Sequence, residues 1–219
     1  MTGPLAKEAG VTYLEEGLHS FELKNGAKFT IYASPYTPEF CDFAFPYERD
    51  EDRFNVEGQA AEGVKSIATN PVPDFPGCQI MMTHGPPKGI MDKNHKGAEC
   101  GCDNLMRAVA RAKPLLYCFG HIHEGYGASL VTWKDSSEPG PGSIEEMTET
   151  IQTYPEASQE SDIMLGKDVL VNPYPAVMQR QEIRVGKDTL MVNSAIMTVR
   201  NQPENTPWVV DLDLPSKQS

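Results

Sequence analysis

A strand–loop–helix–strand pattern between residues 78 and 119 constrains the fold of this chain more than any other feature. Cys78–Thr83 and Leu115–Phe119 are short apolar runs typical of buried strands. Between them, Asp103–Lys113 predicts an amphipathic helix that Pro114 ends. Its apolar residues recur at helical spacing on one face: Leu105, Ala108, Val109 and Ala112. This order is a βαβ pattern, which favours an α/β (α+β) fold.

Other segments are consistent with that class. Lys28–Ala33, Thr189–Ala195 and Trp208–Leu212 predict further strands, and Val11–Leu14 is a short apolar run in a region of strands and turns. Glu57–Ala68 predicts a weak helix interrupted by two glycines. At 219 residues, the chain is expected to form a single domain spanning 1–219.

One segment differs in composition from the rest. Residues 135–162 hold eight acidic residues and no Lys or Arg, together with many Ser, Pro and Gly. Such a composition predicts a disordered acidic insertion, with at most a short helix near Ile144–Ile151.

Histidines follow the ends of predicted strands. His84 comes directly after Cys78–Thr83, and His121 and His123 come just after Leu115–Phe119. Ligands collect at the carboxyl ends of strands in α/β folds, and imidazole commonly binds transition metals. The sequence therefore predicts a metal site at these three residues.

The Gly120-His121-Ile122-His123 sequence is the sharpest of these signals. In an extended backbone, residues i and i+2 point to the same side with alpha carbons about 6.5 Å apart. That spacing suits two imidazoles that each bind one of two neighbouring metal ions. The alternative is a chance His-x-His on a solvated loop.

Three blocks occur in the order found in one family: THGPP at residues 83–87, GCDNL at 101–105 and GHIHEGYG at 120–127. They resemble the C-terminal portion of the calcineurin-like metallophosphoesterases. The closest similarity is to the metallophosphoesterase domain-containing branch, which includes cyclic-nucleotide phosphodiesterases. The resemblance implies an α/β/β/α sandwich, here without its first strands, and a dinuclear site of Mn, Fe, Zn or Ni. It places His84 and His121 on the second metal and His123 on the first.

The chain departs from this pattern in its remaining ligands. The family takes them from Asp-x-His, Gly-Asp and Gly-Asn-His motifs, and none of these occurs in the sequence. The leaving-group histidine is therefore absent, and no catalytic residue is assigned. Three neutral imidazoles also leave the mutual repulsion of two cations uncompensated. A single metal on His84 and His121, completed by water, is expected to bind weakly.

Two further residues are candidates for substrate binding. His95 lies in the loop that the family places near the mouth of the site, and the alternative for it is simple solvent exposure. Tyr126 follows the His-x-His sequence and either flanks the metals or packs as an ordinary aromatic residue. Asp92 and Glu124 are interpreted as loop residues, and Cys100 and Cys102 as loop and helix-start residues, with Asp103 as the N-cap.

Charge and composition restrict the partners. The formal net charge of −12 disfavours a nucleic-acid polymer, and no apolar run approaches the length of a membrane-spanning helix. A small phosphate ester is the expected ligand. No signal peptide is evident and the five cysteines are irregularly spaced, so a cytoplasmic location is expected.

Three functions follow from these features. The first is a metal-dependent phosphoester hydrolase, either truncated or completed by another chain. The second is an inert remnant that binds a ligand or a partner protein. The third is a different chemistry on the same scaffold, as in a specialised metabolic pathway. Exposed sheet edges also predict self-association.

Overall fold

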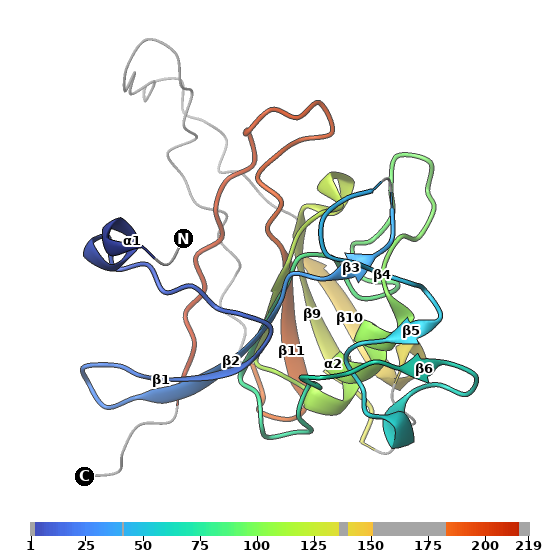
Figure 1. Cartoon of the computed structure of the whole chain (residues 1–219), viewed down its shortest axis with the longest axis horizontal. Coiled ribbons are helices and arrows are strands. Elements are labelled where there is room, and N and C mark those ends of the chain that lie inside the picture. The colour runs from blue at the N-terminus through green and yellow to red at the C-terminus, as the bar shows by residue number, and fades with distance from the viewer. Residues whose placement is uncertain (1–2, 41, 136–139, 151–182, 215–219) are drawn as a thin grey trace.

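A computed structural model of the chain describes residues 3–40, 42–135, 140–150 and 183–214 (Figure 1). Its main feature is a seven-stranded sheet with the order β1-β2-β7-β8-β11-β9-β10. The strands of this sheet are β1 (Gly17–Glu22), β2 (Lys28–Ser34), β7 (Ile80–Thr83), β8 (Leu116–Phe119), β9 (Gly127–Trp133), β10 (Ile144–Thr150) and β11 (Asp188–Asn193). The helices are α1 (Pro4–Glu8) and α2 (Asp103–Ala112). The short elements are β3 (Thr37–Pro38), β4 (Pro46–Tyr47), β5 (Glu51–Asp52), β6 (Lys65–Ser66), and the 3-10 turns η1 (Glu57–Gln59), η2 (His123–Gly125) and η3 (Pro141–Ser143).

The centre of the sheet is parallel and its margins are antiparallel. Strands β2, β7, β8 and β11 run parallel to one another, whereas β1, β9 and β10 pair antiparallel with their neighbours. The four central strands are the ones predicted near residues 28–33, 78–83, 115–119 and 189–195. The βαβ unit β7–α2–β8 is confirmed, and so is the mixed α/β class.

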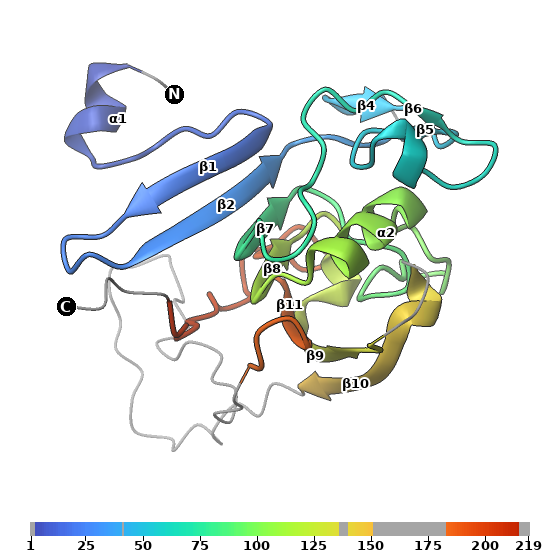
Figure 2. The same ribbon diagram turned by 90° about the horizontal axis from the view of Figure 1, so that it is seen from below.

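Each face of the sheet is covered differently. On one face, α2 crosses the strands (Figure 2) and packs against buried Tyr32, Met81 and Tyr117. On the other face, Leu116 and Val192 belong to a smaller cluster. The side chains that pack against this second cluster from the C-terminal segment are Trp208, Val210 and Leu212.

Several predictions of local structure are wrong. Glu57–Ala68 contains only the η1 turn and β6, because Gly58 and Gly63 interrupt it. Trp208–Leu212 also forms no strand, since its apolar residues pack onto the sheet face by side-chain contacts. The N-cap of α2 is Cys102 and not Asp103, because the Cys102 thiol accepts the Leu105 N–H at 3.3 Å.

The acidic segment is partly ordered as a strand. The short helix expected near Ile144–Ile151 is instead β10, which pairs along its length with β9. Residues 136–139 and 151–162, where disorder was predicted, lie outside the described residues. Strands β1 and β9 were not predicted from the sequence, because their Gly, Ser and Thr residues obscure the apolar pattern.

In the ranges that the structure covers, no helix is long and apolar enough to cross a membrane. The single domain and the cytoplasmic location remain predictions.

Candidate functional site

Two neighbouring parallel strands bring His84 and His121 to the same edge of the sheet. His84 leaves the end of β7 and His121 follows β8, and the two strands pair through Ile80–Leu116 and Met82–Cys118. A backbone hydrogen bond from Gly120 N–H to the His84 carbonyl, 3.0 Å long, joins the two turns. The expectation that these histidines meet at the carboxyl ends of strands therefore agrees with the structure.

The side chains of all three predicted ligands line one open cavity. The His84 and His121 ring centroids are 4.8 Å apart, and the rings are tilted by 56°. His123 lines the same cavity, with Phe43 and the segment 195–197 as further walls. His123 Nδ1 lies 3.1 Å from the Thr198 carbonyl, so this nitrogen is the donor and Nε2 keeps its lone pair in the neutral ring.

The backbone around His121 is a tight turn and not the extended segment assumed from the sequence. Ile122 N–H donates to the Gly120 carbonyl at 2.8 Å, which closes a γ-turn, and the central residue His121 has a φ of +68°. Positive φ is rare for a residue with a side chain and costs of order 1–3 kcal/mol. The strained conformation thus falls on the candidate ligand itself and not on the neighbouring Gly120.

A buried asparagine fixes this turn. Asn193, at the end of β11, donates from Nδ2 to the Ile122 carbonyl at 2.9 Å and to the Met91 carbonyl at 3.3 Å. Its Oδ1 accepts the Ala195 N–H at 3.1 Å. Asn193 therefore holds the residue between His121 and His123 and joins it to two other loops.

A close backbone contact supports the same region. A Cβ placed on Gly125 would lie 1.9 Å from the Met91 carbonyl oxygen, so only glycine fits there. The loop that follows β7 can consequently pack directly onto the turn that carries His123.

Behind the site, a buried hydroxyl pair supports His84. Thr83 Oγ1 donates to the Gly85 carbonyl at 2.7 Å, so the Tyr117 hydroxyl, 2.8 Å away, must donate to Thr83. Tyr117 is fully buried, and this links the start of the His84 turn to the core.

The pKa of each central imidazole is lowered, which favours its neutral form. Partial burial lowers the pKa of His84, although part of its ring is exposed to solvent. Burial also lowers the pKa of His121, with smaller contributions from His84 and His123. Neutral imidazoles have lone pairs free to bind a cation.

The carboxylates nearest to the three histidines in the sequence accept hydrogen bonds from loop backbone. Asp92 is buried, and its Oδ2 accepts the N–H groups of Gly89 at 3.0 Å and Gly101 at 2.9 Å. Glu124 accepts the His95 N–H at 2.8 Å and lies 3.4 Å from His95 Nδ1. Neither carboxylate lines the cavity of the three histidines.

The two predicted substrate contacts lie apart. The His95 side chain is 69% exposed and lines a second cavity, described below. Tyr126 lines neither cavity; its hydroxyl donates to the Thr206 carbonyl at 2.5 Å, and its ring lies 5.9 Å from that of Trp208. A substrate contact for either residue remains a prediction.

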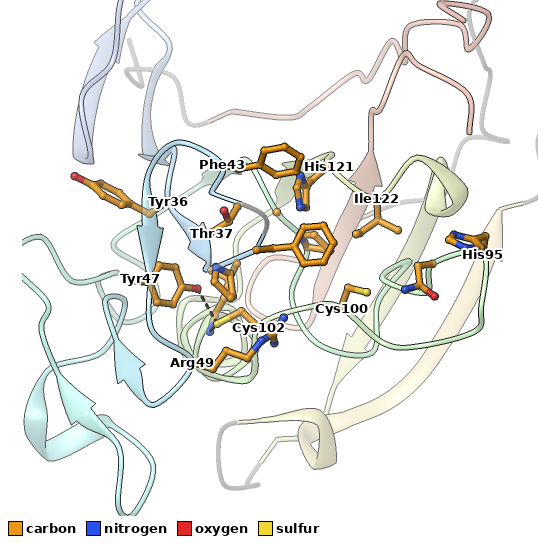
Figure 3. Close-up of a pocket in the computed structure, with 16 residues that line it drawn as sticks. Tyr36, Thr37, Phe43, Tyr47, Arg49, His95, Cys100, Cys102, His121 and Ile122 are labelled. Atoms are coloured by element: carbon orange, nitrogen blue, oxygen red, sulfur yellow. Dashed lines mark hydrogen bonds between the residues drawn. The ribbon is translucent and has the colours of Figure 1, made fainter. Parts of the chain in front are cut away.

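The structure adds a cavity that the sequence did not predict. It has a volume of about 310 Å³, adjoins the histidine cavity through Phe43 and His121, and has an aromatic wall (Figure 3). Its aromatic residues come from one stretch of chain: Tyr36, Phe40, Phe43 and Tyr47. The available signal in the sequence was the Pro- and aromatic-rich composition of residues 34–45.

The donor set fits a dinuclear metal centre only in part. Three imidazoles face one cavity, yet in the described portion of the chain no group of three or more His, Cys, Asp or Glu side chains is arranged to hold a metal ion. No described residue hydrogen-bonds to the His84 or His121 ring to orient it. The site offers imidazole ligands without the carboxylates that would balance two divalent cations.

Comparisons with known proteins agree with this partial match. No family model matches the chain. It is 40% identical over 101 residues to metallophosphoesterase domain-containing protein 1 from Homo sapiens, covering 45% of this chain and 27% of that protein. A UPF0046 protein from Caenorhabditis elegans is 33% identical over 101 residues, which cover 46% of this chain and 22% of that protein.

A third relative carries a different name. A protein named "Probable rhamnogalacturonate lyase C" from Emericella nidulans is 33% identical over 123 residues, which cover 55% of this chain and 10% of that protein. The chain thus spans about a quarter or less of the length of these relatives. Together, the named matches support a metallophosphoesterase-related family for this chain.

Proposed function

We propose that this chain is part of a metal-dependent phosphoester hydrolase that acts on a small phosphate ester. One observation carries the proposal: His84 and His121, from neighbouring parallel strands, present their rings 4.8 Å apart to a cavity that His123 also lines. Metallophosphoesterase domain-containing relatives are consistent with it.

The chain's own residues would bind and orient a cation. His84 and His121 are neutral near pH 7 because burial lowers the pKa of each, so both can donate a lone pair. His123 would add Nε2, since its Nδ1 is held by the Thr198 carbonyl. A divalent ion such as Mn, Fe, Zn or Ni would supply Lewis acidity and an activated water.

The carboxylate ligands of a complete centre would have to come from residues beyond those described, including another polypeptide. A second candidate function follows from the same donor set: a protein that binds a phosphate ester or a partner without hydrolysing the ester. The incomplete ligand set is the specific observation that favours this candidate.

We also propose the finer family and fold assignments. The apolar cluster of Leu116, Ala128, Leu190 and Val192 on the sheet face opposite α2 is compatible with an α/β/β/α sandwich. The THGPP and GHIHEGYG motifs favour the calcineurin-like, cyclic-nucleotide phosphodiesterase-like branch.

The test is metal binding by the purified chain, measured by calorimetry with Mn²⁺, Zn²⁺ and Ni²⁺. We expect weak binding that falls at least about tenfold in His84→Ala and in His121→Ala. His19→Ala is the matched control, because His19 lies on β1 and its ring forms a solvent-exposed contact with the Glu15 carbonyl, away from the three histidines. Unchanged binding in both site variants would refute the proposal.

Hydrolysis of bis(p-nitrophenyl) phosphate then separates the two candidates. Metal-dependent turnover that His121→Ala abolishes supports the hydrolase. Metal binding without turnover, also after addition of candidate partner chains, supports the binding protein.

A further inference from the structure

We propose that the aromatic cavity beside His121 binds a planar aromatic carboxylic acid, and that this group is the part of the substrate remote from phosphorus. The assignment of this group to the substrate rests on the proposed function. Binding of the aromatic acid depends on the cavity alone and can be tested without metal.

The cavity has the size of a small ligand site. Its volume of about 310 Å³ lies near the lower end of the range of roughly 300–1,000 Å³ found for ligand pockets. A group of one or two fused rings would fill such a space, whereas a larger ligand would extend into solvent.

Its walls favour a flat apolar group. Phe40 and Phe43 are 58% and 55% exposed, although their rings meet at an angle of 60° with centroids 6.0 Å apart. A ligand ring that covered both side chains would remove apolar area from water and gain aromatic contacts. Leu105 and Ile122 add aliphatic surface to the same cavity.

Several polar groups of the lining are engaged within the protein. The Tyr47 hydroxyl donates to the Cys102 sulfur at 3.0 Å, and Asn94 Oδ1 accepts the N–H groups of Lys96 and Ala98. His95 is held at Glu124. A carbon ring needs few polar partners, so we expect it to bind in this cavity more tightly than a nucleobase.

One charged group lies at the end of the cavity away from the histidines. Arg49 lines the cavity opposite Phe43 and His121 (Figure 3). Among the described residues, no carboxylate pairs with Arg49, nor with Arg107 or Arg200, whereas Arg53, Arg111 and Arg184 each form an ion pair with an acidic residue. A guanidinium binds a carboxylate through two parallel hydrogen bonds, so an acid group on the ring would complete the site.

Phe43 and His121 line both cavities, so one molecule can occupy both. Its phosphate group would lie near His84 and His121, its ring against Phe40 and Phe43, and its carboxylate at Arg49. The substrate class inferred is thus a phosphate ester of an aromatic hydroxy acid.

The test uses phosphate-free probes in the presence of a chelator. Calorimetry or ligand-observed NMR would compare 2-naphthoate, 2-naphthol and adenosine. We expect 2-naphthoate to bind about tenfold more tightly than 2-naphthol, and Arg49→Gln to remove that preference. Phe43→Ala should weaken both naphthalene probes, and both variants alter exposed side chains that the fold does not require.

Arg200→Gln is the matched control, since Arg200 is an exposed arginine outside the lining of this cavity. Equal affinity of 2-naphthoate for the wild type, Arg49→Gln and Phe43→Ala would overturn the inference. Tighter binding of adenosine than of 2-naphthoate would overturn it as well.

Failure of this inference and failure of the proposed function are distinguishable. His84→Ala should weaken metal binding at least about tenfold and leave the affinity for 2-naphthoate unchanged. Metal binding without 2-naphthoate binding overturns the inference alone, whereas Arg49-dependent 2-naphthoate binding without metal binding supports it and contradicts the hydrolase.

Discussion

His84 and His121 face each other with ring centroids 4.8 Å apart, and the Gly120 N–H to His84 carbonyl hydrogen bond joins their backbones. Two imidazoles at this separation lie close enough to converge on one cation. The relationship depends on the γ-turn at His121, which has a φ of +68°. The turn and the residues that hold it therefore give the sharpest tests of the site.

Replacement of His121 tests the strain at the turn. We expect His121→Gly to be about 1 kcal/mol more stable towards urea than His121→Ala, because glycine adopts positive φ without steric cost. At His123, which lies in η2 and not in the left-handed region, the Ala variant is expected to be more stable than the Gly variant. Equal stability of the two His121 variants would contradict a strained turn.

Asn193 tests how the turn is held. Asn193→Ala should lower the free energy of unfolding by about 1–3 kcal/mol, because it leaves the buried Ile122 carbonyl without its donor. Asn193→Asp keeps an acceptor for Ala195 N–H but loses both donors, so it should be at least as destabilising. Asn25→Ala removes one hydrogen bond, from the Ala27 N–H to Asn25 Oδ1 in an exposed turn, and serves as the comparison in chemical denaturation with a smaller expected loss.

The neutral histidines predict a pH dependence of stability in the metal-free protein. The folded-state pKa values of His84 and His121 lie below the usual value near 6.5, so the unfolded chain binds more protons as the pH falls. Stability should be fully present above about pH 6.5 and decline below it.

Urea midpoints between pH 5 and 8 in a chelator would measure this effect. The His84→Gln, His121→Gln double variant should show a smaller decline than the wild type. An equal decline in both proteins would assign the pH dependence to other groups.

The two edges of the sheet predict where copies of the chain associate. Strand β1 has one acidic residue, whereas β10 carries the adjacent Glu145 and Glu146, which would repel a second β10. Self-association is therefore expected through β1, whose only strand partner in the sheet order is β2.

Sedimentation velocity would test this expectation over a range of concentrations. Ser20→Lys on β1 should shift the chain towards the monomer, and Thr148→Lys on β10 should have no such effect. A wild-type chain that remains monomeric at high concentration would contradict the prediction.

Local patterns sufficed for the centre of the fold. The strands near 28–33, 78–83, 115–119 and 189–195 and the helix at 103–113 each have a continuous or periodic apolar signal, because a buried element must remove its own side chains from water. The position of His84 and His121 at the ends of two such strands followed from the same signal.

The elements at the margins of the fold have no comparable apolar pattern in the sequence. Strand β10 reads as an acidic loop, because its stability comes from backbone pairing with β9 and not from its own composition. The segment 208–212 reads as a strand, yet it packs on the sheet by side chains alone.

The sequence by itself determined the α/β class, the four central strands and the placement of the histidines at strand ends, since these depend on residues close together in the chain. Only the tertiary structure decided that His121 sits in a strained turn held by Asn193, 71 residues from Ile122, and that Phe40, Phe43 and Arg49 enclose a cavity beside it. Such contacts join segments that are distant in the sequence, through hydrogen bonds and complementary shape. They produce no periodic pattern of residues from which they could be predicted.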